Sequence, residues 1–380
     1  MTTTINNEHK KFNVPNLRFP EFQGEWMEST IGKQFELYSG NTPSRLNKDY
    51  FKGEINWISS GELKDHYIYS SKEKISQEAS LNLKLLPAGT FVIAIYGLEA
   101  EGVRGTGSII KEQSTISQAC MAFSSIGEVE NEFLYSWYKK HGNIIGLKYA
   151  QGTKQQNLSY DILERFKIAY PSKQEQEKLC NFISLLDERI ATQNKIIDKL
   201  RSLIKGIAQN VAHNNKPNIS LSECLECSSS TLQESDVCEN GTYPVYGANG
   251  IVGYLDNYNT EKEAVYIIKD GSGVGTVSYV TGKCSATGTL NTLQAKEGYS
   301  LHYLYYLLKV FNFEPYKTGM AIPHIYFKDY GKAKVFCPSY TEQLQYARLL
   351  STIDNKLSIE QNILTKLSLQ KQNLLRQMFI

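Results

Sequence analysis

The chain has 380 residues, enough for two or three domains that each have a core of their own. Its formal net charge of only +2 excludes a uniformly basic nucleic-acid-coating protein, so a site for a polyanion has to be a local patch. Seven scattered cysteines predict reduced thiols and a cytoplasmic location, and neither a signal peptide nor a run of about 18 apolar residues is present.

The first part of the chain, residues 1–170, predicts one mixed α/β domain. Short runs of β-branched and aromatic residues stand between Gly, Pro and Ser, which is the pattern of short strands. A short helix with Phe133 and Trp137 on its inner side is expected over 132–141, and a polar loop over 152–159. The strands are expected over 55–59, 89–96, 107–111 and 120–124.

A long helix is expected over 171–215. Ser172 and Glu175 form the S-x-x-E pattern of a capping box directly after Pro171, which predicts that the helix begins there. Apolar residues then recur at alternating spacings of four and three, as in a coiled-coil seam. The seam consists of Leu179, Ile183, Leu186, Ile190, Gln193, Ile197, Leu200, Ile204, Ile207 and Val211.

A second α/β domain is expected over 216–338. Strands are predicted over 265–269 and 277–280, and a helix over 303–310. The glycine-rich turn 270–276 between the two strands has neither the P-loop pattern nor the dinucleotide-binding pattern, so we interpret it as a tight turn and not as a phosphate cradle.

A second long helix is expected over 339–380. Ser339 and Glu342 repeat the capping box. Its seam consists of Leu349, Ile353, Leu357, Glu360, Leu364, Leu367, Lys371, Leu374 and Met378.

The two long helices repeat each other at a spacing of 167 residues. Lys167, Pro171, Ser172, Glu175, Gln176, Ser184, Asp187 and Leu200 recur as Lys334, Pro338, Ser339, Glu342, Gln343, Ser351, Asp354 and Leu367. Because an exposed amphipathic helix needs a partner for its apolar stripe, the two seams are expected to pair antiparallel within the chain, with dimerisation as the alternative. Gln193 and Glu360 occupy equivalent polar seam positions, which commonly set register.

Several segments resemble the DNA-specificity subunits of type I restriction–modification enzymes. The resemblance is carried by V-P-N-L-R-F-P-E-F-Q-G-E-W at 14–26, S-G-N-T-P-S at 39–44, G-E-I-N-W-I-S-S-G-E-L at 53–63, G-T-K-Q-Q-N-L at 152–158 and Y-P-V-Y-G-A-N-G-I-V-G-Y at 243–254. The second half departs from this pattern, since it has no S-G-x-T-P-S segment and closes with G-M-A-I-P-H-I at 319–325.

The resemblance implies an α+β fold with an internal pseudo-two-fold repeat. Two target-recognition domains, 1–170 and 216–338, would be separated by a long antiparallel two-helix coiled coil made of the spacer helices 171–215 and 339–380. Each domain would read one half of a split sequence in double-stranded DNA. The helices would dock two methylation subunits, which restriction/translocase subunits join. The chain itself would be non-catalytic and hold no cofactor or metal, while S-adenosylmethionine, ATP and Mg²⁺ would belong to the partner subunits.

Candidate DNA contacts lie in loops rich in Gln, Asn, Lys, Arg and Tyr. Gln and Asn pair with adenine edges, and Lys and Arg reach guanine or phosphate. Each of these residues has a plainer reading as a solvated loop or core side chain. The candidates are Arg45, Lys48, Arg104, Lys154, Gln155, Gln156 and Asn157 in the first domain, and Tyr246, Asn249, Lys269, Ser272, Lys317, His324 and Tyr326 in the second.

Two other functions stay open from the residues alone. The chain could be a coiled-coil scaffold that does not read DNA, or a stand-alone DNA-modifying enzyme. The sequence has no N-P-P-Y/F or D-P-P-Y/F motif, no P-loop and no H-x-x-x-H pair, but a short, degenerate nuclease carboxylate cluster has no such signature.

Overall fold

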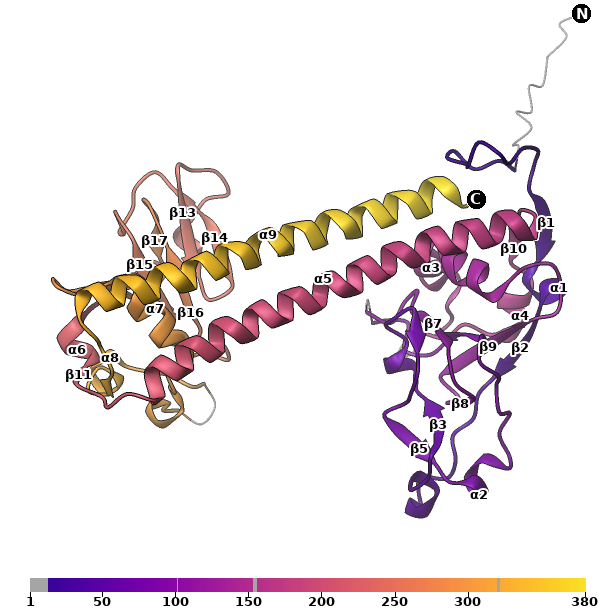
Figure 1. Cartoon of the computed structure of the whole chain (residues 1–380), viewed down its shortest axis with the longest axis horizontal. Coiled ribbons are helices and arrows are strands. Elements are labelled where there is room, and N and C mark those ends of the chain that lie inside the picture. The colour runs from indigo at the N-terminus through magenta and orange to yellow at the C-terminus, as the bar shows by residue number, and fades with distance from the viewer. Residues whose placement is uncertain (1–12, 101, 153–155, 320–321) are drawn as a thin grey trace, which may run out of the picture. The chain divides into compact units, whose positions relative to one another are not determined.

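The computed structural model describes residues 13–100, 102–152, 156–319 and 322–380 (Figure 1). The chain forms two compact units. The first unit comprises Met1–Thr192 and Leu364–Ile380, and the second comprises Gln193–Ile363. Each unit therefore contains one part of helix α5 (Lys173–His213) and one part of helix α9 (Tyr340–Met378).

The first unit is built on two sheets. The larger sheet has the order β2-β9-β6-β7-β4, and a smaller one has the order β5-β3-β8. The β-branched and aromatic run of β6 is buried along its whole length, which explains its central place. The bounds are β2 (Phe35–Ser39), β9 (Cys120–Ser125), β6 (Phe91–Ala94), β7 (Gly107–Ile110), β4 (Tyr67–Ile68), β5 (Glu73–Ile75), β3 (Ile55–Ile58) and β8 (Ser114–Ile116).

Helix α3 (Asn131–Tyr149) packs its aromatic face into the core of the first unit. It runs eight residues beyond the helix expected over 132–141. Gly142 and Gly146 lie in the additional turns and are the contact points of the 104–105 turn. A Cβ on Gly142 would stand 2.9 Å from the Cα of Gly105. The other short elements are β1 (Met27–Thr30), which pairs with β10 (Lys167–Tyr170), and α1 (Ile31–Gln34), η1 (Lys48–Phe51), η2 (Ser60–Glu62), α2 (Gln77–Ser80) and α4 (Tyr160–Glu164).

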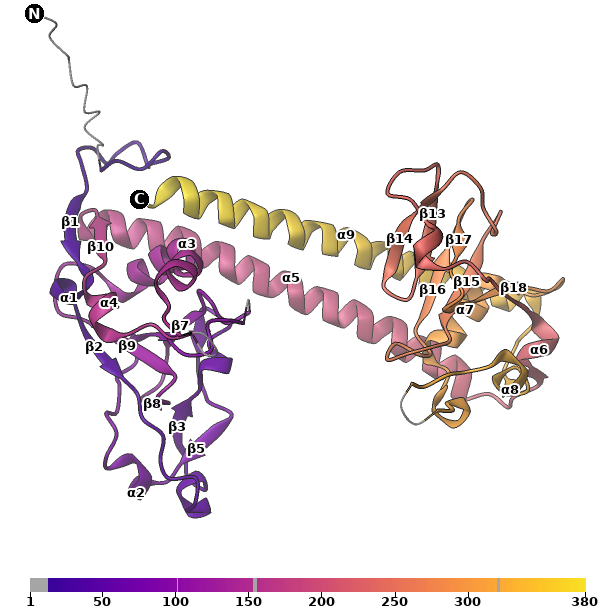
Figure 2. The same cartoon turned by 180° about the vertical axis from the view of Figure 1, so that it is seen from behind.

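The second unit repeats this plan with one strand fewer in its larger sheet (Figure 2). That sheet has the order β12-β18-β15-β16, and the smaller sheet has the order β14-β13-β17. The strands are β12 (Leu225–Ser229), β18 (Leu290–Ala295), β15 (Ala264–Ile268), β16 (Val277–Val280), β14 (Gly250–Leu255), β13 (Tyr243–Gly247), β17 (Ser285–Ala286), and the pair β11 (Ile219–Ser220) and β19 (Lys334–Val335). The helices are α6 (Leu221–Cys224), η3 (Glu234–Asp236), α7 (Leu301–Val310), η4 (Glu314–Tyr316) and α8 (Phe327–Tyr330).

In each unit one buried glutamine fixes the long helix to the start of a second helix, α3 in the first unit and α7 in the second. The backbone N–H of Glu130, the residue before α3, donates to Gln176 Oε1 at 3.0 Å, and Gln176 Nε2 donates to the carbonyl of Pro171 at 2.9 Å. In the second unit the N–H of Ser300 donates to Gln343 Oε1 at 2.9 Å, and Gln343 Nε2 donates to Pro338 at 2.9 Å. The internal repeat thus extends to individual hydrogen bonds.

Residues of α5 and α9 contact one another within each unit. In the first unit Lys371 forms an ion pair with Asp187. In the second unit Gln193 Nε2 donates to the carbonyl of Glu360 at 3.1 Å and also to its carboxylate.

Two details of the expected helices are wrong. Leu349 was placed in the α9 seam but is 49% exposed, whereas Leu350 is buried, so the seam starts one residue later. The capping box at the start of α5 is also absent. The carboxylate of Glu175 instead accepts two hydrogen bonds of 2.7 Å from the guanidinium of Arg18. The box at Ser339 and Glu342 does form, with hydrogen bonds of 3.1 and 2.6 Å.

Candidate nucleic-acid interface

In the first unit, the β6–β7 turn and the loop that closes the domain lie against each other. Tyr96 forms an antiparallel bridge with Asn157, which also bridges to Gln151. The N–H of Leu158 donates to the carbonyl of Ile95 at 2.9 Å. The two loops therefore form one surface feature at the end of the larger sheet.

The second unit has the same arrangement between its β15–β16 turn and its closing loop. His324 forms bridges with Asp270 and with Thr318. The N–H of Gly271 donates to Pro323 at 3.0 Å, and that of Ile325 donates to Lys269 at 2.9 Å. Thr318 and His324 stand 167 residues after Gln151 and Asn157, so the paired loops belong to the internal repeat.

Arg104 and Gln156, two predicted contacts in the first unit, are brought together by this pairing. Arg104 Nη1 donates to the carbonyls of Leu98 and Glu99 at 3.0 and 3.2 Å. The N–H of Gln156 donates to the carboxylate of Glu99 at 3.0 Å and holds the pKa of that acid below its ordinary value. Arg104 therefore orders the turn and also joins it to α3, since its Nε donates to Asn143 Oδ1 at 3.4 Å, and the residue is partly exposed.

Asn157 is more enclosed than its loop position predicts. Its side-chain oxygen is buried and has no hydrogen-bond partner among the residues that the structure describes. Lys154 and Gln155, the other two candidates in this loop, lie outside the described residues.

His324 and Tyr326 form the corresponding group in the second unit. His324 Nδ1 lies 2.6 Å from the carboxylate of Asp270, and both side chains are about one-third exposed. The ring of Tyr326 is 47% exposed and lies at 6.5 Å from that of His324, with Lys328 Nζ 5.3 Å from its centre. Because Asp270 holds one ring nitrogen, the other is available to a base edge or a phosphate.

Three further candidates lie around the same turn. Ser272 is exposed at its tip between Gly271 and Gly275, whose φ angles of 91° and 88° favour glycine. The backbone of Lys269 joins the turn to the closing loop. Lys317 forms an ion pair with Glu314 at 2.5 Å.

The remaining candidates lie elsewhere in their units. Arg45 and Lys48 are beside the smaller sheet of the first unit, where Arg45 forms a two-pronged ion pair with Glu73 and lies 4.1 Å from the ring centre of Phe51. Tyr246 is on β13 and packs against Tyr266, and Asn249 is in the β13–β14 turn. Both groups are separate from the paired loops, so each would add its own contact.

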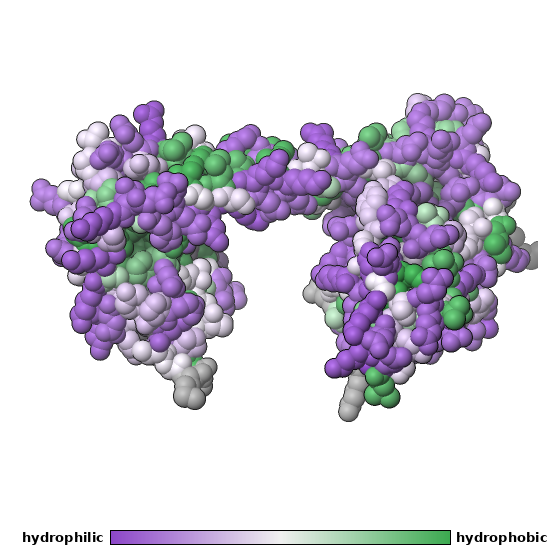
Figure 3. Space-filling view, turned by 60° about the horizontal axis from the view of Figure 1, so that its bottom comes forward, coloured by the Kyte–Doolittle hydropathy of each residue, from purple (hydrophilic) through white to green (hydrophobic). Residues whose placement is uncertain are grey.

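Sequence reasoning missed the two acids that shape these loops, Glu99 and Asp270. Acids near a DNA site look unfavourable in sequence, but here each holds a neighbouring loop residue in place. Figure 3 shows one face of the molecule, on which hydrophilic residues predominate over both units and apolar ones gather in smaller groups.

Comparison with known proteins agrees with this repeated arrangement. Residues 23–202 and 218–369, more than half of the chain, match the model of the type I restriction modification DNA specificity domain. The chain belongs to this family. Each match covers the sheets and short helices of one repeat together with most of a long helix.

Individual specificity subunits are similar to the chain over different lengths. The MjaIX specificity subunit of Methanocaldococcus jannaschii is 30% identical over 187 residues, which cover 46% of this chain and 42% of that protein. The EcoprrI specificity subunit of Escherichia coli is 22% identical and covers 87% of both chains. The solved S subunit of a type I restriction–modification system from M. genitalium shares the fold, with a TM-score of 0.67 at 20% identity, over 97% of this chain and 99% of that one.

No helix in the described part of the chain is both long enough and apolar enough to cross a membrane.

Proposed function

We propose that the chain is the non-catalytic DNA-recognition subunit of a type I restriction–modification complex. The observation that carries the proposal is the paired turn and closing loop that occurs once in each unit, with different side chains in each. Two units whose loops carry different side chains suit a DNA target that consists of two different half-sites. Base edges are read mostly in the major groove, and each correctly read base pair contributes about 1–3 kcal/mol of discrimination.

The long helices α5 and α9 serve as the spacer in this proposal. They would form an antiparallel coiled coil that sets the gap between the two half-sites. The contacts of Asp187 with Lys371 and of Gln193 with Glu360 support this reading, because polar seam residues define register.

The partners follow from the same role. Two methylation subunits would dock on the outer faces of the helices, which carry exposed apolar residues such as Leu185, Ile196 and Ile359. Restriction/translocase subunits would join them, and S-adenosylmethionine, ATP and Mg²⁺ would be bound by these partners. The seven cysteines, all free, suit a cytoplasmic site of action.

Reconstitution tests the proposal against its alternatives. The chain, its methylation subunits and S-adenosylmethionine are mixed with genomic DNA, and methylated positions are mapped by sequencing. We expect one split sequence to be methylated by the mixture and none by the chain alone. Methylation or cleavage by the isolated chain would make it a stand-alone enzyme, and methylation independent of the chain would leave it a scaffold.

Single substitutions in the paired loops test the two readers separately. His324→Ala removes the ring that Asp270 orients, so we expect relaxed specificity in one half of the target and an unchanged other half. Gln156→Ala should relax the opposite half. Each effect should be about tenfold, equivalent to the loss of one base contact. Ser235→Ala, at an exposed position in η3, is the control.

A further inference from the structure

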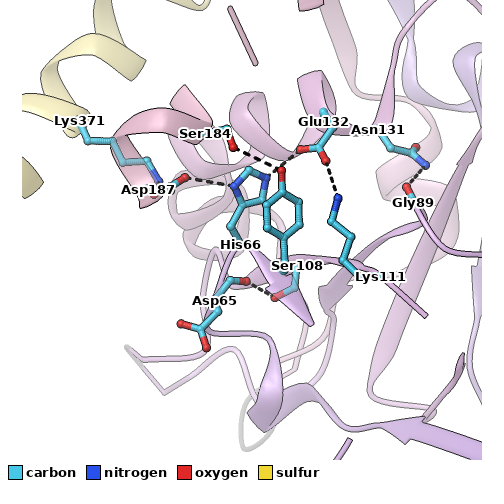
Figure 4. A network of polar contacts seen from close by, with 11 residues as sticks. Asp65, His66, Gly89, Ser108, Lys111, Asn131, Glu132, Ser184, Asp187 and Lys371 are labelled. Carbon is cyan, nitrogen blue, oxygen red and sulfur yellow. Dashed lines mark hydrogen bonds and ion pairs between the residues drawn. The ribbon is translucent and has the colours of Figure 1, made fainter. Parts of the chain in front are cut away.

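Strand β4 closes the larger sheet of the first unit and brings His66 and Tyr67 against two helices. Figure 4 shows His66 between Glu132 and Asp187. The strand runs parallel to β7, with the N–H of Ile109 donating to His66 at 2.8 Å and that of Lys111 donating to Ile68 at 2.8 Å. His66 Nε2 lies 2.8 Å from the carboxylate of Glu132, and Tyr67 Oη lies 3.5 Å from Ser184 Oγ.

The ring of His66 completes this contact. It is stacked between Tyr67 and Tyr135, with centroid distances of 4.0 and 3.9 Å, and its Nδ1 lies 3.3 Å from Asp187. One two-residue strand, together with the histidine before it, thus joins the sheet to α3 and α5.

The second unit has residues at the positions equivalent to those that contact His66 and Tyr67 in the first. Gln176 and Gln343 align the starts of α3 and α7, so Glu132, Tyr135 and Lys139 correspond to His302, Tyr305 and Lys309. The 167-residue repeat makes Ser184 and Asp187 correspond to Ser351 and Asp354. The likeness is close: Lys139 Nζ lies 5.1 Å from the ring centre of Tyr135, and Lys309 Nζ lies 5.0 Å from that of Tyr305.

The strand itself has no counterpart among the described residues of the second unit, where β16 is the edge of its sheet. The N–H of Ile268 donates to the carbonyl of Thr276. In this register Ser278 and Val280, two and four residues further along, are the β16 residues that exchange backbone hydrogen bonds with β15. By the alternation of an antiparallel ladder, the amides of Tyr279 and Thr281 therefore point away from β15. No described group is hydrogen-bonded to either amide.

A cavity of about 660 Å³ lies beside the first turns of α7 and α9, the end of β18 and the residues before β15, and two of its lining residues correspond to contacts of the β4 region in the first unit. His302 and Ser351 line it, and these are the equivalents of Glu132 and Ser184, the residues that contact His66 and Tyr67. The remaining wall includes the apolar side chains of Leu344 and Ala347. The ring of His302 is already stacked on that of Tyr279 at 4.3 Å, so an aromatic side chain of a ligand would extend this stack within the cavity.

The charges around the cavity favour an acidic ligand. Lys262 and Arg348 line it, and His302 stands where the first unit has the acid Glu132. Glu263 also lines the cavity, and the neutral Tyr279 hydroxyl that donates to it does not offset its carboxylate, so an acidic group of the ligand would lie toward Arg348.

We propose that the free edge of β16 and the adjoining cavity bind an extended segment of a partner polypeptide. The segment adds to β16 as a parallel strand, places an aromatic side chain between His302 and Ser351, and carries an acidic residue toward Arg348. The first unit supplies the precedent, because there the chain's own β4 fills the equivalent place. This binding mode is strand addition to a sheet edge, with a pocket that selects the side chain. It does not depend on DNA reading by the loops.

A peptide copied from this chain serves as the probe. Residues 63–70, L-K-D-H-Y-I-Y-S, contain β4 and an acid. The full-length protein is titrated with the labelled peptide by fluorescence anisotropy, and amide hydrogen exchange is followed over 277–281. We expect binding together with slower exchange at Tyr279 and Thr281. A peptide with Tyr67→Ala should bind about tenfold more weakly because it cannot fill the cavity.

Two pairs of protein variants locate the site. Thr281→Pro removes an outward amide without removing a bond to β15, and Thr281→Ala is its control. Ser351→Trp fills the cavity, and Ser351→Ala is its control. We expect about tenfold weaker peptide binding in the first member of each pair and little change in the second. Exchange is also measured in the complex with the methylation subunits and in the presence of duplex DNA.

Three results would overturn the proposal. The first is peptide binding that leaves exchange at 277–281 unchanged. The second is no protection of 277–281 by the peptide or in the complex with the methylation subunits. The third is protection by duplex DNA in place of polypeptide, which would make this edge a nucleic-acid contact.

Discussion

His66 lies at the centre of a network of ionisable side chains in the first unit. Its imidazole lies between the carboxylates of Glu132 and Asp187, while Lys111 approaches Glu132 and Lys371 pairs with Asp187. Burial alone lowers the pKa of His66, but the two carboxylates outweigh it and raise that pKa above its ordinary value. Lys139 lies in the same region, where burial and the neighbouring charge of Lys371 lower its pKa to about 8.

The stability of the first unit should therefore depend on pH through His66. A raised pKa means that its contribution is full below about pH 6.5, the ordinary value, and is lost as the pH rises through the folded value. The pKa of Asp187 is lowered by His66 and Lys371 against the effect of burial, so its contribution is lost only as the pH falls below about 3.9. We expect His66→Phe, which keeps the stacked ring, to lower the free energy of unfolding by about 1–3 kcal/mol near pH 5.5 and by much less above pH 8.

Tryptophan fluorescence during urea unfolding measures this effect, because Trp26, Trp57 and Trp137 all belong to the first unit. His141 gives a control of opposite sign. Burial lowers its pKa despite its hydrogen bond to the carbonyl of Ile380, so His141 favours the folded state least at low pH. If His66→Phe were equally destabilising at both pH values, the charged network would not be the cause.

Arg18 and the α5 residue Glu175 form an enclosed ion pair in the first unit, with side chains 13% and 2% exposed. Arg18→Ala would leave the carboxylate of Glu175 buried without its cation. We expect a loss of about 3–5 kcal/mol in the free energy of unfolding. Arg45→Ala breaks the exposed pair with Glu73 and should cost less than about 1 kcal/mol. Equal losses in the two variants, measured by the same urea titration, would contradict this difference.

At the scale of elements, the glutamines at the starts of α5 and α9 define how each long helix meets its domain. Gln176 and Gln343 are buried and each satisfies a backbone donor and a backbone acceptor. A side chain that does this fixes both the position and the rotation of the helix. The repeat therefore preserves how each long helix is attached to its unit, while the side chains of the paired turn and closing loop differ between the units.

We expect Gln176→Ala to lower the free energy of unfolding of the first unit by about 1–3 kcal/mol, since it leaves the N–H of Glu130 and the carbonyl of Pro171 without their side-chain partner. Gln343→Ala should leave the tryptophan signal nearly unchanged and lower the midpoint seen by circular dichroism, because no tryptophan belongs to the second unit. Gln174→Ala and Gln345→Ala, at exposed neighbouring positions, are the controls. A large tryptophan shift in Gln343→Ala would show that the units do not unfold independently.

At the scale of the whole molecule, the proposed spacer makes a numerical prediction. Seven residues inserted after Thr192 and seven after Ile363 add one heptad to each helix and keep the seam in register. At 1.5 Å per residue the insertion lengthens each helix by about 10.5 Å, so the gap between half-sites should increase by about three base pairs at 3.4 Å each. The half-sites themselves should stay unchanged in the methylated sequence. Insertion in α5 alone breaks the register and should abolish methylation, and an unchanged gap in the double insertion would exclude the spacer role.

The sequence by itself was sufficient for the repeat, the two long helices, the central strands and the loops that close each domain. These features depend on local patterns: heptad spacing, β-branched runs between glycines, and equal residue types at a constant separation. The same patterns put His324, Gln156 and their neighbours among the candidate contacts, although whether they touch DNA stays a prediction.

Only the tertiary structure decided which partner each polar side chain takes. Glu175 fits a capping box in sequence, but Arg18, 157 positions away in the chain, holds its carboxylate. Leu349 and Leu350 fit a seam equally well in sequence, and packing within the second unit chose Leu350. The place of β4 in the first unit, and the free edge of β16 in the second, likewise depend on contacts between distant residues. Local preference is set by neighbours along the chain, whereas a buried charge or a sheet edge is satisfied by whatever the fold brings within a few ångströms.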